Sequence, residues 1–139
     1  MIELDNKTTL DINTFFLQSI ADSLTDKEIE LIIIQNEEIQ AINAQQRNID
    51  KATDVLSFPY EEMPMSPLGS IVISENFVTE KAEELGHTKS EELALLFIHG
   101  LLHLLGFDHE VDNGEMREKE KSIIEMFSLP KSLIVRNQG

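Results

Sequence analysis

Three of the chain's four histidines lie within eleven residues: His99, His103 and His109, with Gly106 between the last two. Residues four apart on a helix share one face, so His99 and His103 can aim their imidazoles at one point. Gly106 has no Cβ and can end the helix in a left-handed conformation, which lets the chain turn back and bring His109 to that point. Three histidine ligands leave one tetrahedral position open, as in catalytic zinc sites. The spacing therefore predicts one Zn²⁺ per chain, bound by His99, His103 and His109.

The alternative is that these histidines are ordinary core residues, each satisfied by one hydrogen bond, as a lone histidine on an apolar helix commonly is. The pattern also demands a histidine at +4, a glycine at +7 and a histidine at +10. Composition alone produces that combination in roughly one of several thousand chains of this size. We therefore favour the metal site.

A metal with an open coordination position lowers the pKa of bound water to about 7 and can polarise a carbonyl or phosphoryl oxygen. Hydrolysis is thus the leading reaction class. The spacing resembles that of the metzincin proteases, in which a glutamate after the first histidine acts as general base. Gly100 stands at that position here and cannot accept a proton. This argues against peptidase chemistry by that mechanism.

The elements around the motif predict an α+β fold: a small mixed β-sheet of about four strands, packed around a buried metal-binding helix in a metalloprotease-like arrangement. β-branched and alternating apolar runs indicate the strands, and helical spacing with capping residues indicates the helices. We expect strands at 2–5, 28–34, 53–58 and 68–74, and helices at 12–24, from Asn36, at 75–85, from Thr88 to Leu105 and at 114–127.

The order of these elements predicts how the strands pair. Strand 28–34, the helix from Asn36 and strand 53–58 lie within about thirty residues, which predicts a βαβ unit with parallel strands. Strand 68–74 follows a loop, so we expect it antiparallel to its neighbour at the sheet edge. Backbone carbonyls or carboxylates from the strands should hold the second ring nitrogens of the ligand histidines.

The whole chain of 139 residues has the size of one domain, and we expect a single hydrolase domain over 1–139. The absence of cysteine excludes a disulfide partner and thiolate ligands. The N-terminus does not look like a signal peptide, and the longest apolar run falls short of the roughly 20 residues that span a bilayer. We expect a cytoplasmic protein that makes no membrane contact.

The formal net charge of −15 argues against direct binding to a polyanion. The charge is uneven, because the segment from Arg117 to the C-terminus carries five basic and three acidic residues. A polyanion contact should therefore use this segment and isolated residues such as Arg47. The alternative is that these alternating charges only solvate a helix face.

One sequence block is the histidine motif with Gly100 and Asp108, and a second block comprises Asn43, Arg47 and 53–59. Together the two blocks resemble the signature of the YbeY family of bacterial metal-dependent endoribonucleases. The resemblance covers essentially the whole chain. It implies a single-strand-specific endoribonuclease that matures the 3′ end of 16S ribosomal RNA and serves ribosome quality control. Its partners would be ribosomal RNA, the small ribosomal subunit and a basic ribosomal protein.

The same resemblance implies that His99, His103 and His109 bind zinc and that Arg47 is the family's functionally important arginine. We therefore expect Arg47 and His99 to be catalytic. One departure is Gly69-Ser70, where many members have an acid after the glycine. That departure puts in doubt a general role for the acid as catalytic base.

The guanidinium of Arg47 suits a scissile phosphate, because its planar fork is always charged and binds two oxygens at once. A salt bridge with a nearby acid is the alternative. Asp108 also has two possible roles. It can accept a hydrogen bond from a ligand histidine or a proton from the reaction, or it can cap the turn after Gly106. Two other functions stay open, a metallohydrolase with a non-RNA substrate such as a peptide, and a metal-binding ribosome assembly factor without nuclease activity.

Overall fold

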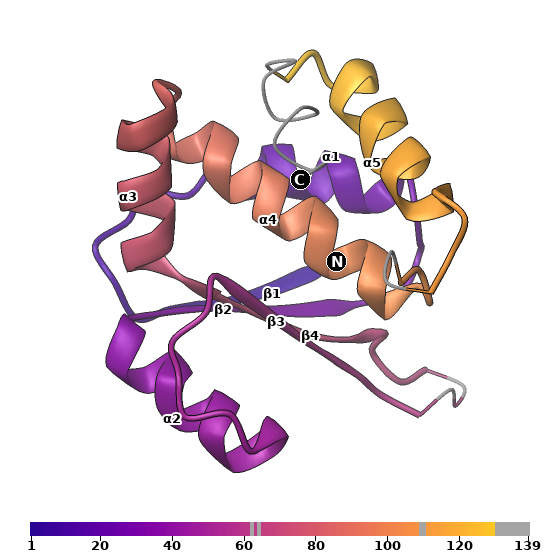
Figure 1. Cartoon of the computed structure of the whole chain (residues 1–139). Helices are drawn as coiled ribbons and strands as arrows, with labels where there is room; N and C mark the ends of the chain where they lie inside the picture. The colour runs from indigo at the N-terminus through magenta and orange to yellow at the C-terminus, as the bar shows by residue number, and fades with distance from the viewer. Residues whose placement is uncertain (62, 64, 109–110, 130–139) are drawn as a thin grey trace.

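A computed structural model describes residues 1–61, 63, 65–108 and 111–129 (Figure 1). This part of the chain forms a four-stranded sheet and five helices, close to the predicted elements. The order is β1 (Ile2–Asn6), α1 (Thr14–Asp22), β2 (Ile29–Ile34), α2 (Asn36–Arg47), β3 (Val55–Pro59), β4 (Gly69–Ser74), α3 (Glu75–Leu85), α4 (Lys89–Leu104) and α5 (Glu115–Met126).

The strands lie in the order β1-β2-β4-β3, so the sheet is mixed. β1, β2 and β4 are parallel neighbours, whereas β3 pairs with β4 in antiparallel fashion. The predicted parallel unit from β2 through α2 to β3 is therefore wrong, and the parallel βαβ unit is β1-α1-β2. The predicted edge position of β4 is also wrong, although its antiparallel pairing with β3 is confirmed.

Burial explains why β4 lies inside the sheet and β3 at its edge. Every residue of β4 is buried, and a strand buried on both faces needs neighbours and helices around it. β3 ends in Pro59, which has no backbone N–H to donate to a neighbouring strand. Proline is tolerated in a sheet mainly at an edge, where its nitrogen faces away from the ladder.

Helices cover both faces of the sheet (Figure 1). α1, α3, α4 and α5 lie on one face, over the larger hydrophobic core, and α2 lies on the other. The smaller core under α2 joins Ile39 of that helix to Ile34, Leu56 and Val72 of the sheet. Successive strand residues point to opposite faces, so β3 contributes to both cores.

α4 is the buried helix that the sequence predicts. A capping box opens it, with the Thr88 side chain on the Glu91 N–H and the Glu91 carboxylate on the Thr88 N–H. Gly106 follows its end at φ +99°, in the left-handed region expected for it. A Cβ at Gly100 would lie 2.9 Å from Cγ2 of Ile71, so this glycine lets α4 pack directly on the sheet.

The start of α2 is capped by the residue before Asn36. α2 begins at Asn36 itself, and Gln35 precedes it as the N-cap, in a capping box with Glu38. The side-chain oxygen of Asn36 instead accepts a hydrogen bond of 2.7 Å from Ser74 Oγ. This contact ties the start of α2 to the end of β4.

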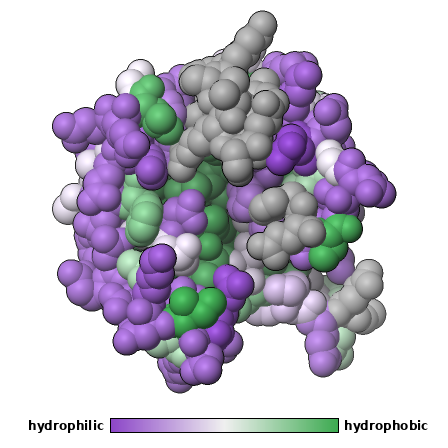
Figure 2. All heavy atoms as spheres, in the orientation of Figure 1, coloured by the Kyte–Doolittle hydropathy of each residue, from purple (hydrophilic) through white to green (hydrophobic). Residues whose placement is uncertain are grey.

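Hydrophilic side chains cover most of the face seen in Figure 2, and hydrophobic residues show mainly near its middle and at isolated spots. Within the described residues, no helix has the length and apolar character needed to cross a membrane.

Candidate active site

A pocket of about 510 Å³ lies where α2, β3 and α4 meet, beside the turn that follows Gly106. It brings together parts of the chain that are far apart in sequence. Its walls are Arg47 at the end of α2, Asp54 and most of β3, the two histidines of α4, and Asp108. The two sequence blocks singled out above therefore line one cavity.

His99 and His103 converge in this pocket, as their spacing predicts. Their Nε2 atoms are 3.2 Å apart, and their rings meet edge to face with centroids 4.7 Å apart. Two nitrogen ligands at about 2.0–2.1 Å from a tetrahedral zinc ion would be about 3.3–3.4 Å apart. The pair therefore fits a shared divalent metal.

The third ligand of the prediction, His109, lies outside the described residues. Among those described, no group of three or more histidine, cysteine or acidic side chains is placed to hold a metal ion. Ligation by His99, His103 and His109 thus stays a prediction, supported by the geometry of the first two.

The second ring nitrogen of His99 is held by Glu120 of α5, across a distance of 2.9 Å between Nδ1 and Oε1. The Glu120 side chain is 4% exposed. A carboxylate accepts here, so Nδ1–H of His99 is the donor, and in the neutral imidazole this arrangement leaves the lone pair on Nε2. Carboxylates hold metal-binding histidines in this way in many proteins.

Sequence reasoning missed Glu120 and expected an acceptor from the strands. The acceptor comes from the last helix instead, because α5 packs over α4 on the face away from the sheet. A signal was available in the sequence. Glu120 lies on the buried stripe of α5 with Met116, Ile123 and Ile124, and an acid within such a stripe needs a buried partner.

Arg47 occupies the last turn of α2, and Asn48 ends that helix in the left-handed conformation at φ +58°. Arg47 borders the same pocket as the two histidines. No carboxylate of the described residues forms an ion pair with it. The salt-bridge alternative therefore finds no support in the part of the chain that the structure describes.

Asp108 borders the pocket and also holds the turn after Gly106. The turn is held by its backbone carbonyl, which accepts from the N–H groups of Val111 and Asp112 at 3.2 and 3.1 Å. Its side chain is therefore not needed as the acceptor of those two bonds.

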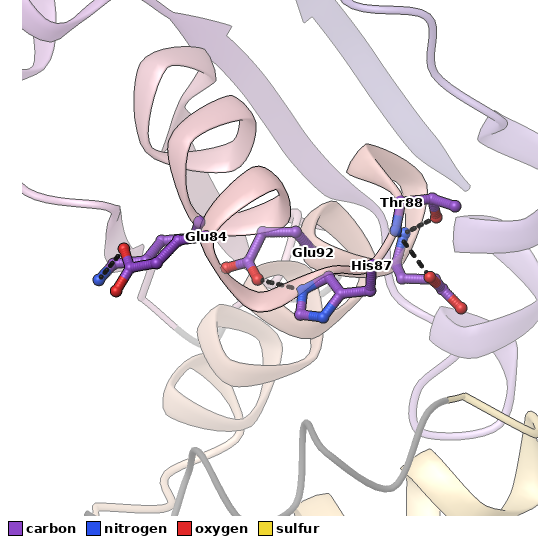
Figure 3. Close-up of polar contacts among 6 residues, drawn as sticks. Glu84, His87, Thr88 and Glu92 are labelled. Atoms are coloured by element: carbon purple, nitrogen blue, oxygen red, sulfur yellow. Dashed lines mark hydrogen bonds and ion pairs between the residues drawn. The ribbon is translucent and has the colours of Figure 1, made fainter.

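The fourth histidine, His87, lies outside the pocket in the turn between α3 and α4 (Figure 3). Its Nε2 is 2.8 Å from Oε1 of Glu92, and the two side chains are 5% and 0% exposed. This pair has the same chemistry as His99–Glu120 but lies near the start of α4. It ties that end of the helix to the turn before it.

The Gly69-Ser70 departure is part of a separate cluster that does not line the pocket. Tyr60 Oη and Ser70 Oγ lie 2.7 and 3.0 Å from Oε2 of Glu30 and 2.5 Å from each other, so the two hydroxyl protons are shared among three contacts. The Ser70 hydrogen bond alone would lower the pKa of Tyr60, but the Glu30 bond and charge, with partial burial, outweigh it and raise that pKa above its usual 10.0. An acid is thus present near Ser70, on the neighbouring strand.

Comparisons with known proteins agree with this architecture. The family model described as endoribonuclease YbeY matches residues 2–128. A relative from Sulfurimonas denitrificans, named endoribonuclease YbeY, is 63% identical over 139 residues and covers 100% of both chains. One of the same name from Aliarcobacter butzleri is 62% identical and covers 99% of both. A solved solution structure from Thermotoga maritima has a TM-score of 0.63 at 31% identity, covering 91% of this chain and 89% of that one.

Proposed function

This chain belongs to the endoribonuclease YbeY family and is an endoribonuclease, and from that premise we propose that its active site is the pocket between α2, β3 and α4. The substrate would be single-stranded ribosomal RNA, at the 3′ end of 16S RNA during maturation and quality control. The observation that carries the proposal is the meeting of Arg47, His99 and His103 in one cavity.

The family is metal-dependent, and we assign the metal to His99, His103 and His109, with zinc as the ion. When bound, such an ion supplies Lewis acidity and favours hydroxide at neutral pH. The chain's part is to present neutral imidazoles. Glu120 holds the proton on Nδ1 of His99 and thereby keeps its Nε2 aimed into the pocket.

Arg47 would bind the scissile phosphate, since its guanidinium forms two charge-assisted hydrogen bonds to phosphate oxygens. Such a contact is worth most when it is aimed at charge that develops in the transition state. Among the described residues, the carboxylates that line the pocket are those of Asp54 and Asp108. We assign the acceptance of the proton released during cleavage to one of these two.

The acidic surface bears on how RNA reaches this pocket. At a net charge of −15 the chain repels bare RNA at long range. We therefore propose docking on the small ribosomal subunit through a basic ribosomal protein, with the exposed bases of α5, Arg117, Lys119 and Lys121, nearest to RNA. A ribosomal substrate would place the protein in the cytoplasm.

Three variants test the proposal on a single-stranded RNA that carries the 3′ end of 16S ribosomal RNA. His103→Ala should lose the metal, measured by elemental analysis, and lose cleavage. Arg47→Glu should keep the metal and lower the cleavage rate by about a hundredfold or more. Lys81→Glu makes the same charge change on α3, outside the pocket, and should cleave like the parent chain.

The opposite results separate the alternatives. If Arg47→Glu and Lys81→Glu cleave equally well, Arg47 does not contact the phosphate. If cleavage survives His103→Ala in a metal-free preparation, the activity is a contaminant or lies elsewhere. A protein that binds the subunit with its metal but cuts no RNA would instead be the assembly factor that its acidity also suits.

A further inference from the structure

β3 exposes one edge of its backbone beside the active-site pocket. In the part of the chain that the structure describes, it is the last strand of the sheet, with β4 as its one neighbouring strand. Val55, Leu56, Ser57 and Pro59 of this strand line the pocket with the two histidines. The unpaired edge of the sheet and the candidate active site are therefore continuous.

The register shows which backbone groups point away from the sheet. The carbonyl of Asp54 accepts from the Ser74 N–H at 2.9 Å, and the Tyr60 N–H donates to the Leu68 carbonyl at 3.1 Å. In an antiparallel pair, alternate residues bond to the neighbour and those between them face outward. Val55, Ser57 and Pro59 are thus the outward residues, which agrees with a proline at the third of these positions.

Of these three outward residues, only Ser57 has both a backbone N–H and a backbone C=O without a hydrogen-bond partner among the described residues. The Val55 N–H already donates to Oδ1 of Asp54 at 2.8 Å, and Pro59 has no N–H. No group of the described residues outside the sheet hydrogen-bonds to the Ser57 backbone. Its side chain is anchored, because Ser57 Oγ donates to the Gly100 carbonyl at 3.0 Å, one residue from His99.

We propose that the backbone N–H and C=O of Ser57 bind the Watson–Crick edge of one unpaired base next to the cleaved bond. Every RNA base carries a donor beside an acceptor on that edge, and proteins read unstacked bases there. A paired base has this edge occupied, so the contact selects single strands without selecting a sequence. The inference rests on the proposed function, because it places the base by the same pocket.

A peptide added to the sheet as a further strand fits this edge less well. Strand addition uses a row of alternating donors and acceptors, and two of the three outward residues here lack a free N–H. Ser57 offers one donor and one acceptor, and its outward neighbours Val55 and Pro59 offer only carbonyls. This arrangement matches a single base better than a peptide strand. The phosphate contact proposed for Arg47 across the pocket points to the same occupant.

The test uses a single-stranded oligouridylate in which one N3-methyluridine is moved from position to position. N3-methylation removes the donor of uracil's Watson–Crick edge and leaves the backbone unchanged. We expect cleavage by the metal-loaded chain to fall about tenfold when the methyl group is at one fixed offset from the cut bond. Cleavage that is insensitive to the methyl group at every position would overturn the proposal.

Two substitutions assign the contact to Ser57. Ser57→Ala removes only the hydroxyl, and Ser57→Pro also removes the outward N–H, so their difference reports on the N–H. We expect Ser57→Pro to raise KM for the oligouridylate about fivefold to tenfold above Ser57→Ala. An ester in place of the amide between residues 56 and 57 gives the same comparison if the proline variant does not fold.

The two proposals fail in different ways. If the parent chain and His103→Ala cut the unmodified oligouridylate equally or not at all, the proposed function fails. If cutting depends on His103 but Ser57→Pro, the ester and Ser57→Ala share one KM, only the role of Ser57 fails. If a basic peptide competes with the oligouridylate and the peptide's binding depends on the 57 N–H, the edge is a peptide site instead.

Discussion

Replacing Glu120 by glutamine should weaken metal binding while leaving the fold in place. The amide can still accept from Nδ1 of His99, but the charge that strengthens the present 2.9 Å bond is lost. Outer carboxylates of this kind contribute about tenfold to hundredfold in metal affinity. We therefore expect Glu120→Gln to raise the Kd for Zn²⁺ by at least about tenfold.

The size of the effect on melting follows from linkage. A tenfold weaker Kd removes about 1.4 kcal/mol of the stabilisation that excess zinc provides. For a chain of 139 residues, an unfolding entropy of about 2.1 cal/mol/K per residue converts this to about 5 °C. The zinc-induced rise in Tm should thus be about 5 °C smaller in Glu120→Gln than in the parent chain.

The chain offers a matched control in the His87–Glu92 pair (Figure 3). Glu92 is buried, lies 2.8 Å from an imidazole and belongs to α4, but it does not line the pocket. Glu92→Gln should therefore lower the free energy of unfolding by about 1 kcal/mol and leave the zinc affinity unchanged. Calorimetric titration with Zn²⁺ and melting with and without it measure both quantities. Equal zinc affinities in both variants and the parent chain would refute the role of Glu120.

Two further predictions concern packing and titration. Gly100→Ala should lower the free energy of unfolding by about 1–2 kcal/mol in a denaturant titration, because the alanine Cβ would lie 2.9 Å from Cγ2 of Ile71. This crowding exceeds the gain in helix propensity. An unchanged or higher stability would contradict the close contact. Tyr60 is the chain's only tyrosine, so tyrosinate absorbance reports it directly. Its pKa should lie above 10.0, and the rise should be smaller in Glu30→Gln. The stability that depends on the neutral phenol should be present below pH 10 and be lost as the pH rises through the raised pKa. An unshifted titration would contradict the Glu30 contact.

Local structure was predictable because its causes lie within a few residues. The capping box of Thr88 and Glu91 marks the start of α4, and the glycines after α3 and α4 adopt positive φ where the helices end. The convergence of His99 and His103 follows from helical geometry alone. Each of these features depends on a contact that spans four residues or fewer, which a single sequence displays.

Strand order and the partner of His99 were not predictable in the same way. Chain order suggested that β2 and β3 are parallel, yet burial of β4 on both faces places it between them. Glu120 reaches His99 across 21 residues, and only the packing of α5 on α4 brings them together. Both depend on which surfaces meet in the folded chain, and the apolar pattern leaves that choice open.

The observed position of β3 explains why the histidine motif and the 53–59 block line the same pocket. One face of β3 packs Val55 and Ser57 against Gly100 of α4, while Leu56 on the other face packs under α2. The strand thus holds Arg47's helix and the histidine helix on either side of one pocket. A glutamate at position 100 would need space that Ile71 and Ser57 already fill. Restoring the protease-type base would therefore require moving α4 off the sheet, so this glycine excludes that base by packing as well as by chemistry.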